Sequence, residues 1–477
     1  MKITLSTIQY NKKKPIIEVD MSFLMAVFLI FSCFSQVDAL DLPLSRIPDD
    51  SLLRIRMKDS WFSETPSRVL ARRAVFEQLG SGERVEVRTV EGREEFMVLI
   101  SRELMRGVSA GNSAAVSRTG TGQYPGWAQG SWMLTRRKDT GAGTLIRIFL
   151  RSDQYTYIQF RPFTNDKCQM DVVLYGGYIV RSLPVAVPFE RLYTMQLNDI
   201  LTLAGDKFPR RYFEPDPQYY RDSRRFIAQV REHIRGLRFA DDGAIDENGN
   251  YVFINTLRPQ NSASAGLNCS GFAKWLIDGM LRPVTGERLT IAPLKAPFGE
   301  RGSSFTENWE ASRDPYFGLD WIRNLAAEAN KTLRSPSYSA LNEFEVRSDN
   351  FSLVMVNENR TFVTQSYPGF LAEAGYGVEG LQPLLYTLAV DDPFSFYLAA
   401  VNTEIGAPIT PENLRGAPRL RQYFHVAALV PYFDENGNFR IVVFESAEET
   451  SFSAFRSRYP GHYVNLVKIP VSAAFDP

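Results

Sequence analysis

Apolar residues recur at helical spacing in three stretches of the chain. The clearest is a helix predicted from about Cys269 to Leu281, with an apolar face formed by Ala273, Leu276, Ile277 and Met280. Two further amphipathic helices are predicted over residues 219–237 and 319–329. The second half of the chain is therefore expected to mix helices with the strands described below, which is the pattern of an α+β fold.

Residues 40–215 show a different pattern, in which short apolar runs are separated by turn signals. This pattern predicts a β-rich first domain. A hairpin is predicted at Gly176-Gly177, and the Gly-rich stretch Gly107–Gly130 is expected to be a mobile loop. A short helix is expected around Pro66–Gln78, followed by strands at Val85–Arg88, Phe96–Ile100, Leu145–Leu150, Tyr155–Phe160, Cys168–Tyr175 and Tyr178–Val180.

A pentapeptide that occurs twice organises the second domain, which is predicted over residues 216–477. Asp-Glu-Asn-Gly-Asn stands at Asp246–Asn250 and again at Asp434–Asn438. It resembles part of a calcium loop, but the first ligand positions would be Ala244 and Tyr432, which cannot serve. Both copies are therefore predicted to be Asn-Gly hairpin turns.

The loop before the first predicted helix brings a thiol to the start of that helix. Asn268 is a good N-cap, and the flexible run 261–266 suits a loop that enters a helix. Unpaired N–H groups and the positive end of the helix dipole favour the thiolate at such a position. Since the thiolate is the nucleophilic form, Cys269 is a candidate for covalent catalysis.

A thiol nucleophile needs a base, and the chain has three histidines. His233 lies beside the apolar face of the 219–237 helix, where a structural role is expected. His425 and His462 each open a predicted strand, from which an imidazole can project into a cleft. On chemistry alone the two remain close competitors.

The second hairpin favours His425. If Phe433 pairs with Phe439, Glu445 lies opposite Ala427 on the same face as His425. A carboxylate there can accept the Nδ1–H of the imidazole and stabilise the imidazolium. A one-residue slip would turn Glu445 away, leaving it as an edge glutamate in water.

Two motifs that contain these residues resemble those of a known protein family. Asn-Cys-Ser-Gly-Phe at 268–272, followed by His-Val-Ala-Ala-Leu at 425–429, resembles the NlpC-like cysteine peptidases of bacterial cell walls. The resemblance implies a papain-like domain, in which the helix carrying the Cys packs on an antiparallel sheet carrying the His. It also implies hydrolysis of amide bonds in peptidoglycan stem peptides by Cys269 and His425, with Glu445 in the place of the third catalytic residue.

The resemblance covers residues 246–281 and 420–470. Cys269 and His425 are 156 positions apart (425 − 269), so an insertion is expected over about 282–420. This segment is expected to carry specificity or to cover the cleft. An inert cell-envelope binding module is an alternative from another class, and a thiol acyltransferase with the same Cys/His pair is a second alternative.

The N-terminus predicts export. Three lysines precede an apolar run at 21–34, and Val37-Asp38-Ala39 fits a cleavage site, so residues 1–39 are interpreted as a signal peptide. The location expected is the periplasm or cell envelope, with no transmembrane span in the mature chain. A lipid-anchored Cys33 and a buried N-terminal helix are the alternatives.

The composition of the chain further restricts the classes of partner and cofactor that are expected. Lys and Arg total 54, as do Asp and Glu, so there is no bulk charge to attract nucleic acid. No Cys/His cluster has the spacing of metal ligands, and no cofactor is expected. After cleavage only Cys168 and Cys269 would remain, and their pairing in an oxidising compartment is the alternative to a free nucleophile.

Overall fold

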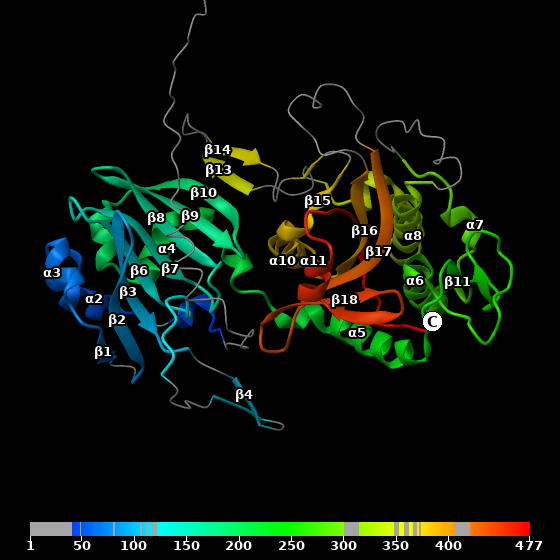
Figure 1. Ribbon diagram of the computed structural model, residues 1–477, viewed down its shortest axis with the longest axis horizontal. Helices are drawn as coiled ribbons and strands as arrows, with labels where there is room; N and C mark the ends of the chain where they lie inside the picture. Colours follow the sequence, from blue (N-terminus) through cyan, green and yellow to red (C-terminus); the bar gives the residue numbers. More distant parts are fainter. Residues whose placement is uncertain are drawn as a thin grey trace, which may run out of the picture.

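The computed structural model describes residues 41–47, 49–79, 82–104, 122–299, 314–347, 374–405 and 420–477, with the short stretches 107–110, 113–116, 353–356, 362–365 and 370–371. Within these ranges the protein is a mixed α+β structure with two large sheets, seen side by side in Figure 1. The expected signal peptide and Cys33 lie outside the described residues. Part of the loop expected at Gly107–Gly130 does too, although a hairpin of β4 (Gly107–Ala110) and β5 (Ser113–Val116) is described within it.

The first sheet has the strand order β1-β2-β3-β6-β7-β8-β9-β10-β13-β14. Neighbours are antiparallel except for β10 and β13, which run parallel. Alternate residues are buried, as in β2, where Val85 and Val87 share the core with helices α2 (Ser51–Met57), α3 (Pro66–Leu70) and α4 (Leu197–Ala204). The strands are β1 (Val75–Gln78), β2 (Arg84–Glu91), β3 (Glu95–Arg102), β6 (Trp132–Arg137), β7 (Gly143–Phe149), β8 (Tyr157–Thr164), β9 (Lys167–Leu174), β10 (Gly177–Val185), β13 (Leu353–Val356) and β14 (Phe362–Gln365).

The helix predicted around Pro66–Gln78 is wrong in its second half. Helix α3 ends at Leu70, and the chain becomes extended in β1, where Val75 pairs with Val87 of β2. β-Branched and aromatic residues such as Val75 and Phe76 fit a pleated surface. The available edge of β2 therefore decides the conformation of this stretch.

The turn between β9 and β10 lies one residue before the position that was predicted. Leu174 pairs with Gly177, so the two turn residues are Tyr175 and Gly176. Both have positive φ, 47° and 85°, as a type I′ hairpin turn requires. Gly177 itself is the first residue of β10.

The second sheet has the order β15-β20-β16-β17-β18-β19, and every neighbouring pair is antiparallel. One face packs on α5, α6 and α8 and the other on α10 and α11, so Phe396 and Tyr397 enter different cores. The strands are β15 (Tyr376–Gly377), β16 (Ser395–Ile405), β17 (Leu420–Phe433), β18 (Phe439–Glu445), β19 (Glu448–Ser451) and β20 (Tyr463–Pro470). The helices are α5 (Arg221–His233), α6 (Cys269–Thr285), α8 (Phe317–Leu333), α10 (Leu381–Asp391) and α11 (Phe452–Arg458).

The β17–β18 hairpin has the predicted register. Phe433 pairs with Phe439, and the ladder continues in step to Ala428 and Phe444. In the turn, the N–H of Asp434 donates to the carbonyl of Asn438, and Gly437 has φ 79°. The first copy of the pentapeptide likewise forms the turn of a hairpin, between β11 (Gly243–Ile245) and β12 (Tyr251–Phe253).

The expected insertion at 282–420 supplies elements of the domain core. This segment supplies α8, which packs on α6 and on strands of the second sheet. It also supplies β16, which lies between β20 and β17 at the centre of that sheet. These two elements therefore form the core of the domain that holds Cys269 and do not merely cover it.

The predicted Cys269 helix is confirmed, and it extends past Pro283 to Thr285. A proline lacks the N–H that would bond the carbonyl four residues earlier, here that of Gly279. The N–H of Asp476 donates to this carbonyl instead, at 2.7 Å. The C-terminal tail thus completes the hydrogen bonding of α6.

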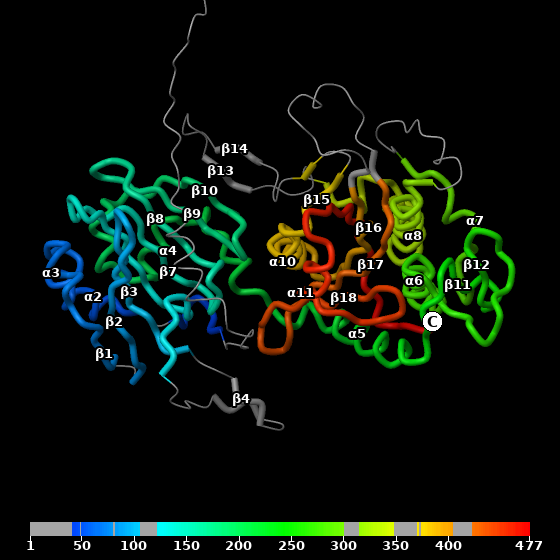
Figure 2. Tube along the Cα trace, in the orientation of Figure 1, coloured from blue at the N-terminus to red at the C-terminus, as the bar shows by residue number. Residues whose placement is uncertain are grey.

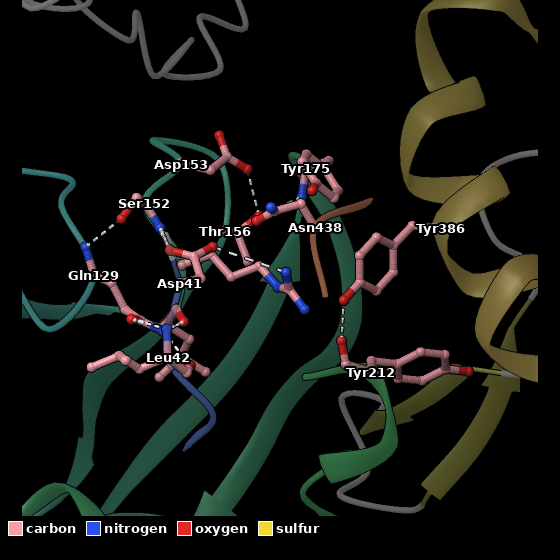
Figure 3. Close-up of polar contacts among 12 residues, drawn as sticks. Asp41, Leu42, Gln129, Ser152, Asp153, Thr156, Tyr175, Tyr212, Tyr386 and Asn438 are labelled. Carbon is pink, nitrogen blue, oxygen red and sulfur yellow. Dashed lines mark hydrogen bonds and ion pairs between the residues drawn. The ribbon is translucent and has the colours of Figure 1, made fainter. Parts of the chain in front are cut away.

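The two sheets meet through aromatic and polar side chains, shown in Figure 3. Tyr386 of α10 points to the backbone of Tyr212, and its hydroxyl donates to that carbonyl. The buried guanidinium of Arg151 lies 5.4 Å from the ring of Tyr386 and 6.0 Å from that of Phe433. Phe433 belongs to the core of the first sheet although its strand belongs to the second. Helix α5 follows in the chain and runs along the second sheet (Figure 2).

Candidate active site

The N-terminal turn of α6 carries Cys269. The Asn268 side chain accepts a hydrogen bond from the N–H of Gly271 at 2.8 Å, so the predicted N-cap is confirmed. Cys269 is the first helical residue and is partly exposed. Its sulfur therefore lies beside backbone N–H groups that the helix leaves unpaired.

Two contacts fix this turn in place. A Cβ at Gly271 would lie 1.9 Å from the carbonyl oxygen of Gly243, so only glycine allows α6 to approach β11 this closely. The indole Nε1–H of Trp321 in α8 donates to the carbonyl of Ser270 at 2.8 Å. The residues that flank the thiol are thus held by two different elements.

Strand β17 brings His425 to Cys269. The ladder with β16 shifts between the pairs Val401–His425 and Asn402–Tyr423, which leaves Phe424 as the extra residue of a bulge. His425 and the backbone N–H of Val426 both lower the pKa of the Cys269 thiol, so the two groups lie close to the sulfur. His425 and Val426 both lie in the part of β17 beyond its last pair with β18.

Glu445 is the third member of the cluster. It ends β18, and its Oε2 lies 2.6 Å from Nε2 of His425. The predicted contact is through Nδ1, but the structure uses Nε2. Nδ1 is then the ring nitrogen available to the thiol.

In the cluster of Cys269, His425 and Glu445, each charged group stabilises the charge of its neighbour. Burial would raise the pKa of Cys269, but hydrogen bonds from His425 and Val426 hold it below its ordinary value. Burial would lower the pKa of His425, but the thiolate and Glu445 raise it to about 9. Glu445 is buried, yet its pKa is depressed by His425 and Arg458. The opposite shifts of the two pKa values favour a thiolate beside an imidazolium.

The other candidates lie elsewhere. His462 hydrogen-bonds the carbonyl of Pro460 through Nδ1, at 3.0 Å, and its ring contacts Phe424 and Tyr459. His233 is exposed and bonds to the carbonyl of Gln229 at 2.9 Å. Both histidines thus bond to a carbonyl of their own segment, whereas His425 interacts with the thiol.

The two described cysteines are both free, so they do not form the disulfide considered as an alternative. Cys168 lies in the core of the first sheet, fully buried. Burial raises the pKa of its thiol to about 12. The pKa of Cys269 is shifted in the opposite direction, below its ordinary value.

Arg458 and Tyr459 also lie at the site, although no sequence pattern predicts them there. Arg458, the last residue of α11, places its guanidinium 2.6 Å from Oε1 of Glu445. The Tyr459 ring lies 5.5 Å from that of His425, at an interplanar angle of 31°. Their only signal in the sequence is a helix of two turns after Ser451, too short to stand out by spacing.

Comparisons with known proteins inform the first sheet only. A family model described as a domain of unknown function, DUF8515, matches residues 43–212. Neither a curated protein nor a solved structure matches the chain. Cys269, His425 and Glu445 lie outside the matched range.

In the described ranges, no group of three or more His, Cys, Asp or Glu side chains is arranged to hold a metal ion. No helix there is both long and apolar enough to cross a membrane. The apolar run at 21–34 lies outside the described residues.

Proposed function

We propose that the chain is an exported cysteine peptidase or amidase that hydrolyses amide bonds in peptidoglycan stem peptides. The observation that carries this proposal is the contact chain from Cys269 through His425 to Glu445, with 2.6 Å between imidazole and carboxylate. The packing of α6 on β17 and β18 supports a papain-like domain. Export and the choice of substrate rest on the N-terminal sequence and on the resemblance to NlpC-like peptidases.

The reaction begins at the sulfur. The Cys269 thiolate attacks the amide carbonyl, and its own backbone N–H at the start of α6 helps to hold the oxyanion. When the C–N bond breaks, the imidazolium of His425 gives its proton to the leaving amine. Water then attacks the thioester as His425 takes up its proton, and the C–S bond breaks to release the acid. Glu445 keeps the imidazole oriented through both steps.

An inert binding module is the alternative that the geometry disfavours. In a purely structural site, a thiol is expected to behave as Cys168 does, with a pKa raised by burial. Cys269 instead has a cationic partner and a backbone donor at its sulfur. These contacts stabilise the charged form that catalysis requires.

Digestion of purified peptidoglycan tests the proposal. Full-length protein should release stem-peptide fragments detectable by mass spectrometry, and Cys269→Ala should release none. His425→Ala should lose activity at least about 10²-fold, as expected for a general acid and base. His462→Ala is the matched control and should retain activity. Cleavage by Cys269→Ala, or loss of activity in His462→Ala alone, would refute the assignment.

A further inference from the structure

Glu445 has a cationic partner on each carboxylate oxygen. Oε2 contacts Nε2 of His425 and Oε1 contacts the guanidinium of Arg458, both at 2.6 Å. The Glu445 side chain is 4 % exposed, whereas that of Arg458 is 48 % exposed. One oxygen therefore faces the reacting pair and the other faces a cation that reaches in from the surface.

Short connections hold Arg458 beside Glu445. Glu445 pairs with Glu448 across the tight β18–β19 turn, and α11 begins immediately after β19. Ser451 caps this helix by accepting the N–H of Ala454 at 3.1 Å, and Phe455 is buried beneath it. Arg458 is thus carried on an anchored helix and not on a free loop.

A carboxylate with one partner can rotate about that contact, but a carboxylate with one partner per oxygen has its orientation defined. Small misplacements of groups that support an active site have large effects on rate. The contact with Arg458 therefore determines where Glu445 directs its other oxygen, and so where the imidazole stands relative to Cys269.

We propose that Arg458 is a positioning residue for this site: by holding Oε1 of Glu445, it keeps Oε2 on His425 and keeps the carboxylate ionised. The inference rests on the proposed function and extends it from three residues to four. Arg458 touches neither substrate nor sulfur in this role. It acts through Glu445 alone.

Charged and titratable groups face Glu445 from every element around it. His425 comes from β17, while Arg458 and Tyr459 come from the end of α11. Glu448 of β19 lies opposite Glu445 in the ladder but is exposed. Arg458 is the cation of this set that does not take part in proton transfer. Its removal leaves a buried carboxylate whose ionisation depends on His425.

Alkylation of Cys269 by iodoacetamide across pH tests the proposal in the full-length protein, with mass spectrometry of the Cys269 peptide as the readout. In Arg458→Gln, Glu445 should take up a proton at higher pH, so the acidic limb of the alkylation profile should move upward. The rate at acidic pH should fall roughly 10- to 100-fold relative to wild type. Arg458→Lys keeps the charge and should restore most of the acidic limb.

Arg456→Gln is the matched control. Arg456 lies on the same helix but contacts Gln382, at 3.5 Å, whereas the partners of Glu445 are His425 and Arg458. This variant should give the wild-type profile, which excludes a general effect of lost charge. A melting curve for each variant shows that it is folded at the pH of the assay.

The results distinguish the positioning role of Arg458 from the proposed function of the Cys269–His425 pair. If wild-type Cys269 titrates well below an ordinary thiol and Arg458→Gln does the same, the positioning role is overturned while the Cys269–His425 pair stands. If wild-type Cys269 behaves as an ordinary thiol, the proposed function itself fails. If Arg456→Gln and Arg458→Gln shift the profile equally, a specific role of Arg458 is refuted.

Discussion

At the scale of single residues, α6 carries a second buried pair of charges besides the one at its start. Lys274 and Asp278 are one turn apart, and each side chain is 1 % exposed. The ammonium donates to the carboxylate at 2.6 Å and to the carbonyl of Ile245 at 2.8 Å. The carboxylate also accepts the N–H of Leu289 at 2.9 Å. The pair therefore ties α6 to the segments on either side of it.

Breaking this pair should destabilise the protein strongly. Asp278→Asn leaves the Lys274 ammonium buried without a counter-charge, and we expect a loss of about 3–5 kcal/mol in the free energy of unfolding. The exposed pair Glu328–Lys331 on α8 is the matched control, and Glu328→Gln should change stability by less than about 0.5 kcal/mol. Urea unfolding measures both. Equal effects would contradict this account of the buried pair.

At the scale of elements, the two ends of α6 use glycine for different reasons. Gly271 lies where a Cβ would meet the Gly243 carbonyl oxygen, whereas Gly286 lies in open space with φ +75°. Gly271→Ala creates a steric clash and should cost about 3 kcal/mol or more. Gly286→Ala only forces a left-handed backbone and should cost about 1 kcal/mol.

The two substitutions should also differ at the thiol. Gly271→Ala displaces the first turn of α6, so it should change the alkylation rate of Cys269 as well as the free energy of unfolding. Gly286→Ala should leave that rate at the wild-type value. If both variants alkylate like wild type, the close approach of α6 to β11 does not position Cys269.

Elements defined by local chemistry could be predicted from the sequence. The cap at Asn268 and the Asn-Gly turn at Asp434–Asn438 act over a few residues, and the turn sets the register that brings Glu445 to His425. Arg458 could not be predicted, because its contact depends on where β19 and α11 fold back. The parallel pairing of β10 with β13 was likewise inaccessible, since it joins strands far apart in the chain.

At the scale of the whole molecule, the hairpin that carries Glu445 also joins the two sheets. One end of β17–β18 lies at Cys269, while at the other end Phe433 enters the core of the first sheet. Tyr220 and Tyr386 both contact the Phe433 ring, at 5.1 and 5.3 Å between centroids. The sheets are therefore expected to unfold as one unit.

Truncation of the Phe433 side chain should weaken the coupling between the two sheets. Phe433→Ala leaves a cavity between the two sheets, and we expect a loss of about 3–5 kcal/mol. Calorimetry should show one transition in wild type and two in the variant. Phe424→Ala, on the same strand but partly exposed, should keep the single transition. Two transitions already present in wild type would show that the sheets unfold independently.

The central claim is that Cys269 and His425 form a reactive ion pair, and the pH dependence of Cys269 alkylation tests it most directly. The lowered pKa of Cys269 and the His425 pKa of about 9 place the thiolate–imidazolium pair between these two values. Alkylation in wild type should therefore begin well below the ordinary thiol pKa of about 8.5. In His425→Ala, burial acts without its cationic partner, so the onset should move to higher pH. An onset near about 8.5 in both proteins would contradict the account.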